Sequence, residues 1–286
     1  MSLLKIKHME NKKKVAILYI ATGRYIAFWE NFYNSSESKF LIDCDKHYFL
    51  FTDSEEKILE SNVTKVYQKK LGWPFDTLYR FDFFLSIEED LRNFDYIFFI
   101  NANTDFIEKI YYKDIFINRC KKIIFVPHPL IFHLNSKKFP YERNILSKAY
   151  IPYGAGSYYV IGGFNGGEAK EYLEMCKKLS KNIKCDLENN IIAVWHDESH
   201  INKYCLDNIK KIQILSPYFS KAEIEWWKKS KICFLDKSHY KYGGHDYLRG
   251  ISDEKITIEE WTKKLNNNQP KKLKLRVMQY IKSLLF

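Results

Sequence analysis

Short runs of β-branched and aromatic residues alternate along this chain with segments of helical periodicity, and this alternation limits the folds open to it. The predicted strands are residues 14–22, 48–52, 63–68, 96–100, 122–126, 157–161, 212–215 and 232–235. Two amphipathic helices are predicted over residues 80–93 and 168–181, because apolar residues recur there at three- and four-residue spacing. This order favours an α/β fold with a mostly parallel central sheet and flanking helices, which binds ligands at the carboxyl ends of its strands.

Size and composition favour one large domain with short additions at its ends. The chain has 286 residues, of which 46% are hydrophobic, enough for a substantial core. We expect an N-terminal extension over residues 1–13, an α/β domain over 14–250 and a basic tail over 251–286. No apolar run reaches the ~20 residues of a membrane span and no secretory signal opens the chain, so we expect a cytoplasmic location.

The end of the tail, residues 261–286, carries most of the formal net charge of +11, because seven Lys or Arg and no acidic residue occur from Trp261 onward. Residues 266–270 have the composition of a linker, and residues 271–286 predict a helix whose apolar and basic side chains lie on different faces. This helix could dock on the parent domain or a second subunit, or make peripheral contact with an anionic membrane. No RNA-reading motif is interleaved with the basic residues, so no nucleic-acid partner is expected.

The stretch VWHDESH, residues 194–200, places two histidines four residues apart with two carboxylates between them. A zinc-protease helix needs the glutamate directly after the first histidine, whereas Glu198 lies two positions after His196, about 200° around a helix. Apolar residues at 201, 204 and 205 instead predict a helix with Asp197 as its N-cap and an ionised Glu198 in its first turn. Such a carboxylate could stabilise an oxocarbenium-like sugar, or it could belong to an ordinary helix start.

Two further stretches follow predicted strands. Residues 95–100 run into Asn101-Ala102-Asn103, where nucleotide-sugar transferases commonly carry Asp-x-Asp to hold a divalent cation. Asparagine amides form hydrogen bonds but carry no charge, and this pattern alone also fits a plain turn. Residues 158–167 (YYVIGGFNGG) contain two glycine pairs, which allow a ligand close to the backbone or form a strand–turn–helix junction. Their spacing is not G-x-G-x-x-G, so no dinucleotide site is expected.

Together these stretches resemble glycosyltransferase family 6, the family of the histo-blood-group A and B transferases and α-1,3-galactosyltransferase, and especially its bacterial branch. The resemblance spans residues 15–249 and includes IATGRYIAFWENF (20–32), FTD (51–53), LGWP (71–74), TLYRF (77–81), DYIFFINAN (95–103), HP (128–129), YERN (141–144), AYIP (149–152), YYVIGGFNGG (158–167), VWHDESHINKY (194–204) and LSP (215–217). It implies a retaining transferase of GT-A fold that adds galactose or N-acetylgalactosamine in α-1,3 linkage to a galactosyl acceptor.

The resemblance also implies roles for individual residues. It places the donor against Ile20, Ala21, Thr22, Tyr25, Arg80, Asn101, Ala102 and Asn103, and its sugar beside Ile161, Gly162, Gly163, His196 and Asp197. It assigns the acceptor to His128, Trp195 and Glu198, with Glu198 also as the proposed nucleophile, and it places Lys237 in a C-terminal closing segment. We expect UDP-N-acetylgalactosamine as donor and a galactoside or fucosylated galactoside of a bacterial surface glycan as acceptor. UDP-galactose as donor, or a non-catalytic protein that binds nucleotide sugars or glycans, are the alternatives.

The neutral Asn101-Ala102-Asn103 turn also bears on the metal. Amide oxygens bring no charge to a hard cation, so they cannot replace a pair of carboxylates as its ligands. We therefore expect no divalent metal cofactor, and we expect Arg80 and Lys237 to offset the charge of the departing diphosphate.

Overall fold

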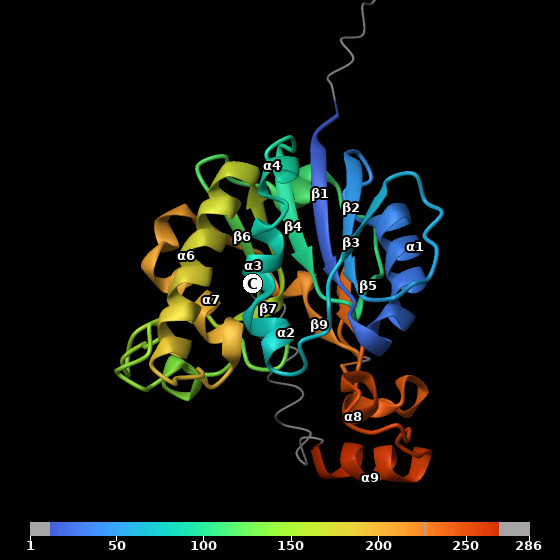
Figure 1. Cartoon of the computed structure of the whole chain (residues 1–286). Helices are drawn as coiled ribbons and strands as arrows, with labels where there is room; N and C mark the ends of the chain where they lie inside the picture. Colours follow the sequence, from blue (N-terminus) through green and yellow to red (C-terminus); the bar gives the residue numbers. More distant parts are fainter. Residues whose placement is uncertain (1–11, 226, 269–286) are drawn as a thin grey trace, which may run out of the picture.

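A seven-stranded sheet lies at the centre of the protein in the computed structural model, which describes residues 12–225 and 227–268 (Figure 1). The strands follow the order β3-β2-β1-β4-β7-β6-β8, and all neighbouring pairs are parallel except the two that involve β7. They are β1 (Lys14–Ile20), β2 (Asp45–Thr52), β3 (Val63–Tyr67), β4 (Tyr96–Ile100), β6 (Ile123–Pro127), β7 (Val160–Glu168) and β8 (Ile212–Ile214). The predicted α/β class and mostly parallel sheet are confirmed.

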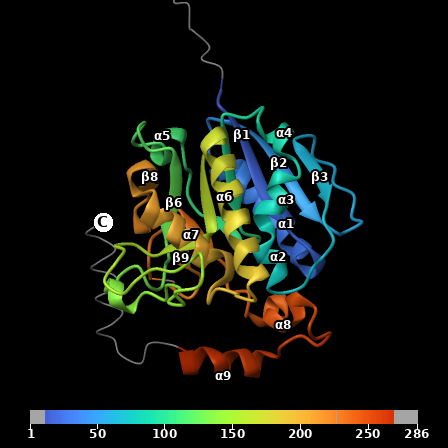
Figure 2. The same cartoon turned by 60° about the vertical axis from the view of Figure 1, so that its left-hand side comes forward.

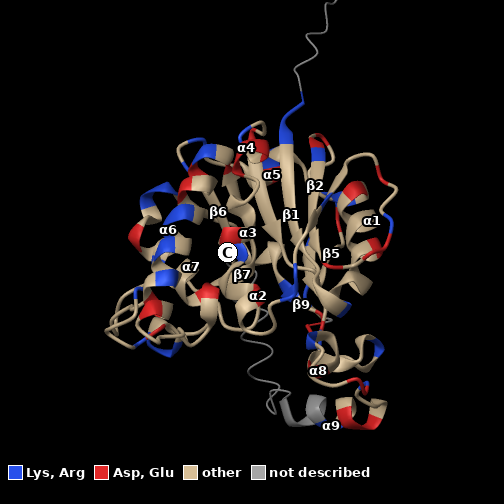
Figure 3. Cartoon of the chain, in the orientation of Figure 1, with Lys and Arg blue, Asp and Glu red and all other residues tan. Residues whose placement is uncertain are grey.

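Helices cover both faces of this sheet (Figures 1 and 2). One face packs on α1 (Trp29–Lys39), and the other on α3 (Arg80–Leu85), α6 (Ala169–Glu188) and α7 (His196–Asp207). Because side chains alternate along a strand, Ile17 of β1 enters the core on the α1 side and Leu18 the core on the α6 side. Figure 3 shows charged residues on the outer faces of the helices and few on the central strands. The shorter helices are α2 (Phe75–Leu78), α4 (Glu88–Leu91) and α5 (Tyr112–Ile115).

A second sheet of three strands brings the C-terminal part of the chain to the end of β4. It consists of β5 (Thr104–Phe106), β10 (Ile232–Phe234) and β9 (Lys221–Ala222). β5 follows the Asn101-Ala102-Asn103 turn and pairs antiparallel with β10. The N–H of Leu235, directly after β10, donates to the Asn103 carbonyl at 2.7 Å. The segment that carries Lys237 is thereby held beside the carboxyl end of β4.

The glycine pairs lie inside a strand, so the predicted strand over residues 157–161 and the strand–turn–helix junction after it are wrong. β7 instead runs from Val160 to Glu168, antiparallel between β4 and β6. A Cβ at Gly166 would lie 2.1 Å from the ring of Phe98, and one at Gly167 would lie 2.3 Å from the carbonyl oxygen of Lys122. Glycine is therefore needed at these positions for close packing in the sheet.

The other predicted elements occur close to their expected bounds, with two exceptions. The helix predicted over residues 80–93 is divided into α3 and α4, because Ile87 leaves helical geometry with φ −121° and ψ 28°. The strand predicted over residues 232–235 belongs to the small sheet rather than to the central one. The helix predicted from residue 168 to 181 is α6, which continues to Glu188.

The C-terminal segment, residues 236–268, packs against the rest of the protein. These contacts continue beyond residue 250, where the end of the domain was expected. Its helices α8 (Gly244–Arg249) and α9 (Ile258–Asn268) lie beyond the carboxyl ends of the central strands (Figures 1 and 2). The indole N–H of Trp261 donates to Asp236 at 3.4 Å, and Arg24 forms an ion pair with Asp253. Residues 266–268, expected in a linker, belong to α9, so that part of the linker prediction is wrong.

The N-terminal extension up to residue 11 and the predicted tail helix lie outside the described residues. Within the described ranges, no helix combines the length and the apolar character needed to cross a membrane.

Candidate active site

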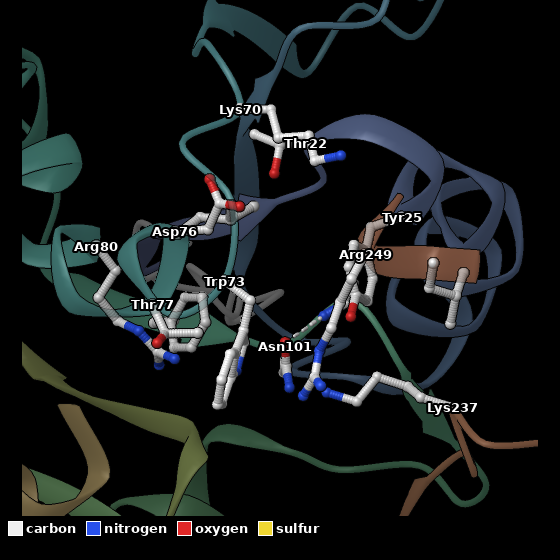
Figure 4. A pocket seen from close by; sticks show the side chains of 14 residues that line it. Thr22, Tyr25, Lys70, Trp73, Asp76, Thr77, Arg80, Asn101, Lys237 and Arg249 are labelled. Carbon is white, nitrogen blue, oxygen red and sulfur yellow. Dashed lines mark hydrogen bonds between the residues drawn. The ribbon is translucent and has the colours of Figure 1, made fainter. Parts of the chain in front are cut away.

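A pocket with a cavity volume of about 130 Å³ lies at the carboxyl ends of β1 and β4, where the fold predicts a ligand site (Figure 4). Its walls come from the end of β1 and the 3-10 helix after it, the segment that runs through α2 into α3, the end of β4 and the turn after it, and the C-terminal segment. The lining residues are Ile20, Thr22, Tyr25, Lys70, Trp73, Asp76, Thr77, Arg80, Phe99, Asn101, Ala102, Lys237, Leu248 and Arg249. Half of these residues were predicted for the donor. Ala21 was also predicted, but it lies fully buried in the core, where its N–H donates to the Phe51 carbonyl.

Positive charge dominates the pocket, since one acidic side chain, Asp76, lines it beside four cationic ones: Lys70, Arg80, Lys237 and Arg249. Lys237 and Arg249 reach in from the C-terminal segment, whereas Arg80 lies across from them (Figure 4). Burial, together with the charges of Arg249 and Arg80, lowers the pKa of Lys237 to about 8. The carboxylate of Asp76 is engaged with its own loop, because it accepts from the N–H groups of residues 71 and 72. A diphosphate in this pocket would meet cations from both sides.

Arg80 is buried and connects β7, α7 and β4. Its Nη1 donates to the carbonyl of Gly162 at 2.9 Å, and its Nη2 lies 3.0 Å from Oδ2 of Asp197. Its guanidinium carbon lies 4.3 Å from the centroid of the Phe99 ring. Burial raises the pKa of Asp197 to about 6, and Arg80 acts in the opposite direction. The N-cap of α7 is Trp195, so the prediction of Asp197 as N-cap is wrong, because its carboxylate pairs with Arg80 instead.

Glu198 lies in the first turn of α7, as predicted, with both carboxylate oxygens hydrogen-bonded. Oε1 accepts from the Tyr159 hydroxyl and Oε2 from the Gly162 N–H, each at 2.8 Å. Burial raises the pKa of Glu198, whereas the two donors and the charges of Arg80 and Lys237 lower it. Two hydrogen bonds fix the orientation of this carboxylate, so little reorganisation is needed when positive charge develops beside it.

The glycines near the start of β7 leave room for the two carboxylates and for Asn101. A Cβ at Gly162 would lie 3.3 Å from Oδ2 of Asp197 and 3.5 Å from Oε2 of Glu198. A Cβ at Gly163 would lie 3.3 Å from the Cβ of Asn101. Ile161, just before them, packs against the core on the α1 side. Three of the five residues predicted beside the donor sugar therefore lie in one stretch of strand next to Asn101 and the carboxylates of α7, although none of the three lines the pocket itself.

The two asparagines after β4 have different roles. Asn101 lines the pocket, and its side-chain oxygen accepts from the N–H of Ala102 at 3.1 Å. Asn103 does not line the pocket; its side-chain amide donates to the Leu235 carbonyl at 2.6 Å. Neither side chain brings a negative charge to the pocket, and the described residues include no group of three or more His, Cys, Asp or Glu placed to hold a metal ion. This donor set does not fit a hard divalent cation.

The two histidines of the VWHDESH stretch lie against different partners. His196 has φ 53°, and its ring centroid lies 4.7 Å from that of Trp73, which itself lies 4.5 Å from the Arg249 guanidinium. His200 is buried, and its Nε2 lies 3.5 Å from the Asp186 carboxylate. Burial lowers the pKa of both imidazoles, that of His200 to about 4. His196 therefore contributes to the wall around Trp73, whereas His200 helps to anchor α7.

The residues predicted for the acceptor lie near Tyr159 and the start of α7. His128 follows β6, and its ring centroid lies 5.9 Å from that of Tyr159. Burial lowers the pKa of His128 to about 4, so this imidazole is neutral at pH 7. Trp195 is 50% exposed, which leaves its indole free to stack on a sugar ring. Glu142 fixes the loop before it, because its Oε2 accepts from the Val194 N–H at 2.6 Å.

Sequence reasoning missed several residues of the site. Trp73, Thr77 and Arg249 line the pocket, and Tyr159 holds Glu198, yet none of them had an assigned role. The signal was present for three of them, because Trp73, Thr77 and Tyr159 lie inside the conspicuous LGWP, TLYRF and YYVIGGFNGG stretches. Arg249 is the last residue of the resemblance, and only the fold places it in the pocket.

Comparison with known proteins decides the family. A family model for glycosyltransferase family 6 matches residues 1–238 of the chain. The chain belongs to glycosyltransferase family 6. It is 33% identical over 234 residues to the O-antigen biosynthesis glycosyltransferase WbnI of Escherichia coli, an alignment that covers 81% of this chain and 98% of that protein.

Two animal relatives of this family 6 glycosyltransferase are more distant. The globoside alpha-1,3-N-acetylgalactosaminyltransferase 1 of Gallus gallus is 29% identical, over 72% of this chain and 61% of that protein. The histo-blood group ABO system transferase 2 of Rattus norvegicus is 26% identical, over 79% of this chain and 70% of that protein. The chain is thus an enzyme of GT-A-like fold that takes a nucleotide-sugar donor and a glycan acceptor.

Proposed function

We propose that this family 6 enzyme is a retaining α-1,3-N-acetylgalactosaminyltransferase that works without a divalent metal. Its donor is UDP-N-acetylgalactosamine, and its acceptor is a galactoside, with or without fucose, of a bacterial surface glycan. The relatives support this substrate class, because one is named for O-antigen biosynthesis and another is named as an alpha-1,3-N-acetylgalactosaminyltransferase.

The position of Glu198 is the observation that carries the proposal. A carboxylate held by Tyr159 and Gly162 lies in the same helical turn as Asp197, the ion-pair partner of the pocket residue Arg80. When the bond between the sugar C1 and the diphosphate oxygen breaks, positive charge develops on the sugar, and a fixed carboxylate stabilises it. Glu198 acts either as a covalent nucleophile or as a charge beside front-face attack, and both routes retain the anomeric configuration.

The cations of the pocket support the metal-free part of the proposal. A departing UDP carries negative charge that fixed positive groups can stabilise in place of a metal ion. Arg80 is fixed by Gly162 and Asp197, and Lys237 and Arg249 approach from the C-terminal segment. The neutral asparagines after β4 offer no carboxylate that would compete with the diphosphate for these cations.

The glycines support N-acetylgalactosamine over galactose. Neither Gly162 nor Gly163 projects a side chain at the edge of the pocket, and an N-acetyl group needs more space than a hydroxyl. UDP-galactose is the alternative donor, which differs only at this substituent.

The decisive experiment is a donor and acceptor screen in excess EDTA. The enzyme is incubated with UDP-N-acetylgalactosamine or UDP-galactose and with galactosides that carry or lack fucose, and the products are analysed by NMR. We expect α-1,3-linked N-acetylgalactosamine. A product with galactose would establish the alternative donor, a β linkage would exclude retention, and binding of UDP without transfer to any of these galactosides would contradict the proposed acceptor.

We also propose that the enzyme makes peripheral contact with anionic membranes through its basic C-terminal tail, on the cytoplasmic side. The basis is the distribution of basic and apolar residues after position 270, which lies outside the described residues. A chain that ends at Asn268, the last residue of α9, is compared with the full chain in sedimentation with anionic liposomes. Sedimentation of both chains to the same extent would contradict this contact.

A further inference from the structure

The part of the chain that lines the pocket extends beyond the residues matched by the family model. The family match ends at residue 238, yet Leu248 and Arg249 of α8 line the pocket. Figures 1 and 2 show α8 next to the carboxyl ends of the central strands. Since α8 has only six residues, its position depends on contacts with the rest of the protein rather than on its own helical stability.

One side chain, Arg24, makes several of these contacts. It lies in the 3-10 helix Gly23–Phe28 that follows β1, directly before the pocket residue Tyr25. Its Nη1 donates to the carbonyl of Tyr247 at 2.8 Å and to the carbonyl of Ser252 at 2.7 Å. Its Nη2 pairs with Asp253, and its guanidinium carbon lies 4.0 Å from the centroid of the Tyr247 ring.

These contacts hold the chain on both sides of Arg249. The carbonyl of Tyr247 lies two residues before it, and that of Ser252 lies three residues after it. Between them the chain turns sharply at Gly250, which has φ +66°. Arg24 itself does not line the pocket, and its side-chain hydrogen bonds go to the segment around Arg249.

We propose that Arg24 is a positioning residue for the donor diphosphate, which acts by fixing Arg249 over the pocket. The inference rests on the proposed function, because it assumes that Arg249 meets the diphosphate of UDP. The planar fork of an arginine suits this task, since it can reach two carbonyls and a carboxylate at once, whereas a lysine presents a single ammonium group. The two carbonyl bonds matter most, because Asp253 is 97% exposed and an exposed ion pair contributes little.

The first measurement is hydrogen exchange without any ligand. The N–H groups of residues 250, 251 and 252 donate within this segment, to the carbonyls of Tyr247 and Asp246, and so report its opening. We expect Arg24→Ala and Arg24→Lys to increase exchange at these three amides and to leave the amides of β1 unchanged. Unchanged exchange at residues 250–252 in both variants would overturn the inference, whatever donor the enzyme uses.

The second measurement is UDP affinity by titration calorimetry, which needs no turnover. We expect Arg24→Ala to weaken UDP binding about tenfold, and Asp253→Asn to weaken it by less than about threefold, as befits an exposed pair. Glu254→Gln is the matched control on the same turn and should bind UDP like the unchanged protein. Unaltered UDP affinity in Arg24→Ala would overturn the inference.

A double variant separates action through Arg249 from direct contact with UDP. If Arg24 acts through Arg249, then adding Arg24→Ala to Arg249→Ala should weaken UDP binding by less than about twofold further, because the two changes remove one interaction. A full additional tenfold loss would show that Arg24 acts independently, which overturns the inference. Failure of the unchanged protein to bind UDP would instead contradict the proposed function, and the exchange data would still decide whether Arg24 holds the segment.

Discussion

The Tyr159 hydroxyl donates a hydrogen bond of 2.8 Å to Oε1 of Glu198, and the Gly162 N–H donates one of the same length to Oε2. One donor comes from the residue just before β7 and the other from inside the strand, so a single strand fixes the carboxylate of α7. Both bonds favour the ionised form of Glu198 against the burial that raises its pKa. The structure therefore holds a hydrogen-bonded carboxylate in a partly dry site, an arrangement suited to stabilising a cationic transition state.

Substitution of Glu198 by glutamine keeps the shape of the side chain and removes its charge. We expect the transfer rate of Glu198→Gln to fall by at least about 10²-fold, because a charge that stabilises the transition state is lost. UDP affinity should change little, since pocket cations rather than Glu198 face the diphosphate. Steady-state kinetics and calorimetry measure the two effects, with Glu188→Gln at the end of α6 as the control. Transfer within a few fold of the unchanged enzyme would contradict the role of Glu198.

The pH profile should reflect a cation that lines the pocket and the two carboxylates of α7 beside it. Asp197 has a pKa of about 6, so kcat/KM should fall as protonation removes its charge below pH 6. Burial raises the pKa of Glu198, so this carboxylate should lose its charge at higher pH than an exposed glutamate does. Lys237 has a pKa of about 8, lowered by burial and by Arg249 and Arg80, so kcat/KM should also fall as its cation is lost above pH 8. Bound diphosphate favours the charged lysine, so the basic limb of kcat should lie at higher pH than that of kcat/KM.

Tyr159→Phe tests the assignment of the acid limb. The change removes a donor that favours ionised Glu198, so the pKa of Glu198 should rise and the acid limb should move to higher pH. Loss of a hydrogen bond to a charged group should also lower kcat by about tenfold or more. The basic limb, which depends on Lys237, should not move. An acid limb that stays in place would show that Glu198 is not the group that titrates there.

The general architecture was predictable because it depends on local patterns. Apolar runs such as residues 96–100 have the length and composition of buried strands, and β4 occupies that range. β7 was missed because glycine disfavours a strand when judged alone, whereas Gly166 and Gly167 are required by neighbours far away in sequence. The helix divides at Ile87, which packs against the core on the α6 side, a contact that no local pattern encodes.

Site residues that lie inside a sequence motif were predictable, whereas residues that only the fold brings to the site were not. Glu198 and Arg80 belong to conspicuous stretches, and the structure places them within one cluster. Asn103 belongs to such a stretch too, yet its amide holds the Leu235 carbonyl, a contact across 132 positions of sequence. Arg249 and its support by Arg24 depend on contacts between the two ends of the chain, which periodicity and composition cannot reveal.

Donor choice should respond to a single methyl group at Gly163. An alanine Cβ at this position would lie 3.3 Å from the Cβ of Asn101 and 3.5 Å from its side-chain nitrogen, so it would narrow the edge of the pocket. We expect Gly163→Ala to lower kcat/KM for UDP-N-acetylgalactosamine by roughly tenfold relative to UDP-galactose, the scale of a lost hydrophobic contact or a small clash. Competition between the two donors for one acceptor measures the ratio. An unchanged or reversed ratio would exclude pocket volume as the cause.

The final prediction concerns the metal, and it depends on the two asparagines after β4. Asn101 carries no charge, and the amide of Asn103 is engaged by Leu235, so neither side chain supplies the carboxylate that a hard cation prefers. We expect full activity in excess EDTA and no stimulation by manganese. The positive charge that stabilises the departing diphosphate should come instead from the C-terminal segment. Lys237→Ala should therefore lower kcat by about 10²-fold or more, the loss expected when one preorganised group that stabilises the transition state is removed.

Lys241→Ala is the matched control for Lys237→Ala, because Lys241 lies in the same segment but outside the pocket and pairs with Glu223 at 3.6 Å. Its activity should stay near that of the unchanged enzyme. Asn103→Asp provides a second test, since it replaces an amide donor to the Leu235 carbonyl with a carboxylate that repels it. This variant should lose activity through displacement of Lys237, and manganese should not restore it. Activity that EDTA abolishes and manganese restores in the unchanged enzyme would contradict the metal-free proposal and point to a carboxylate such as Asp105 or Asp197 as the missing ligand.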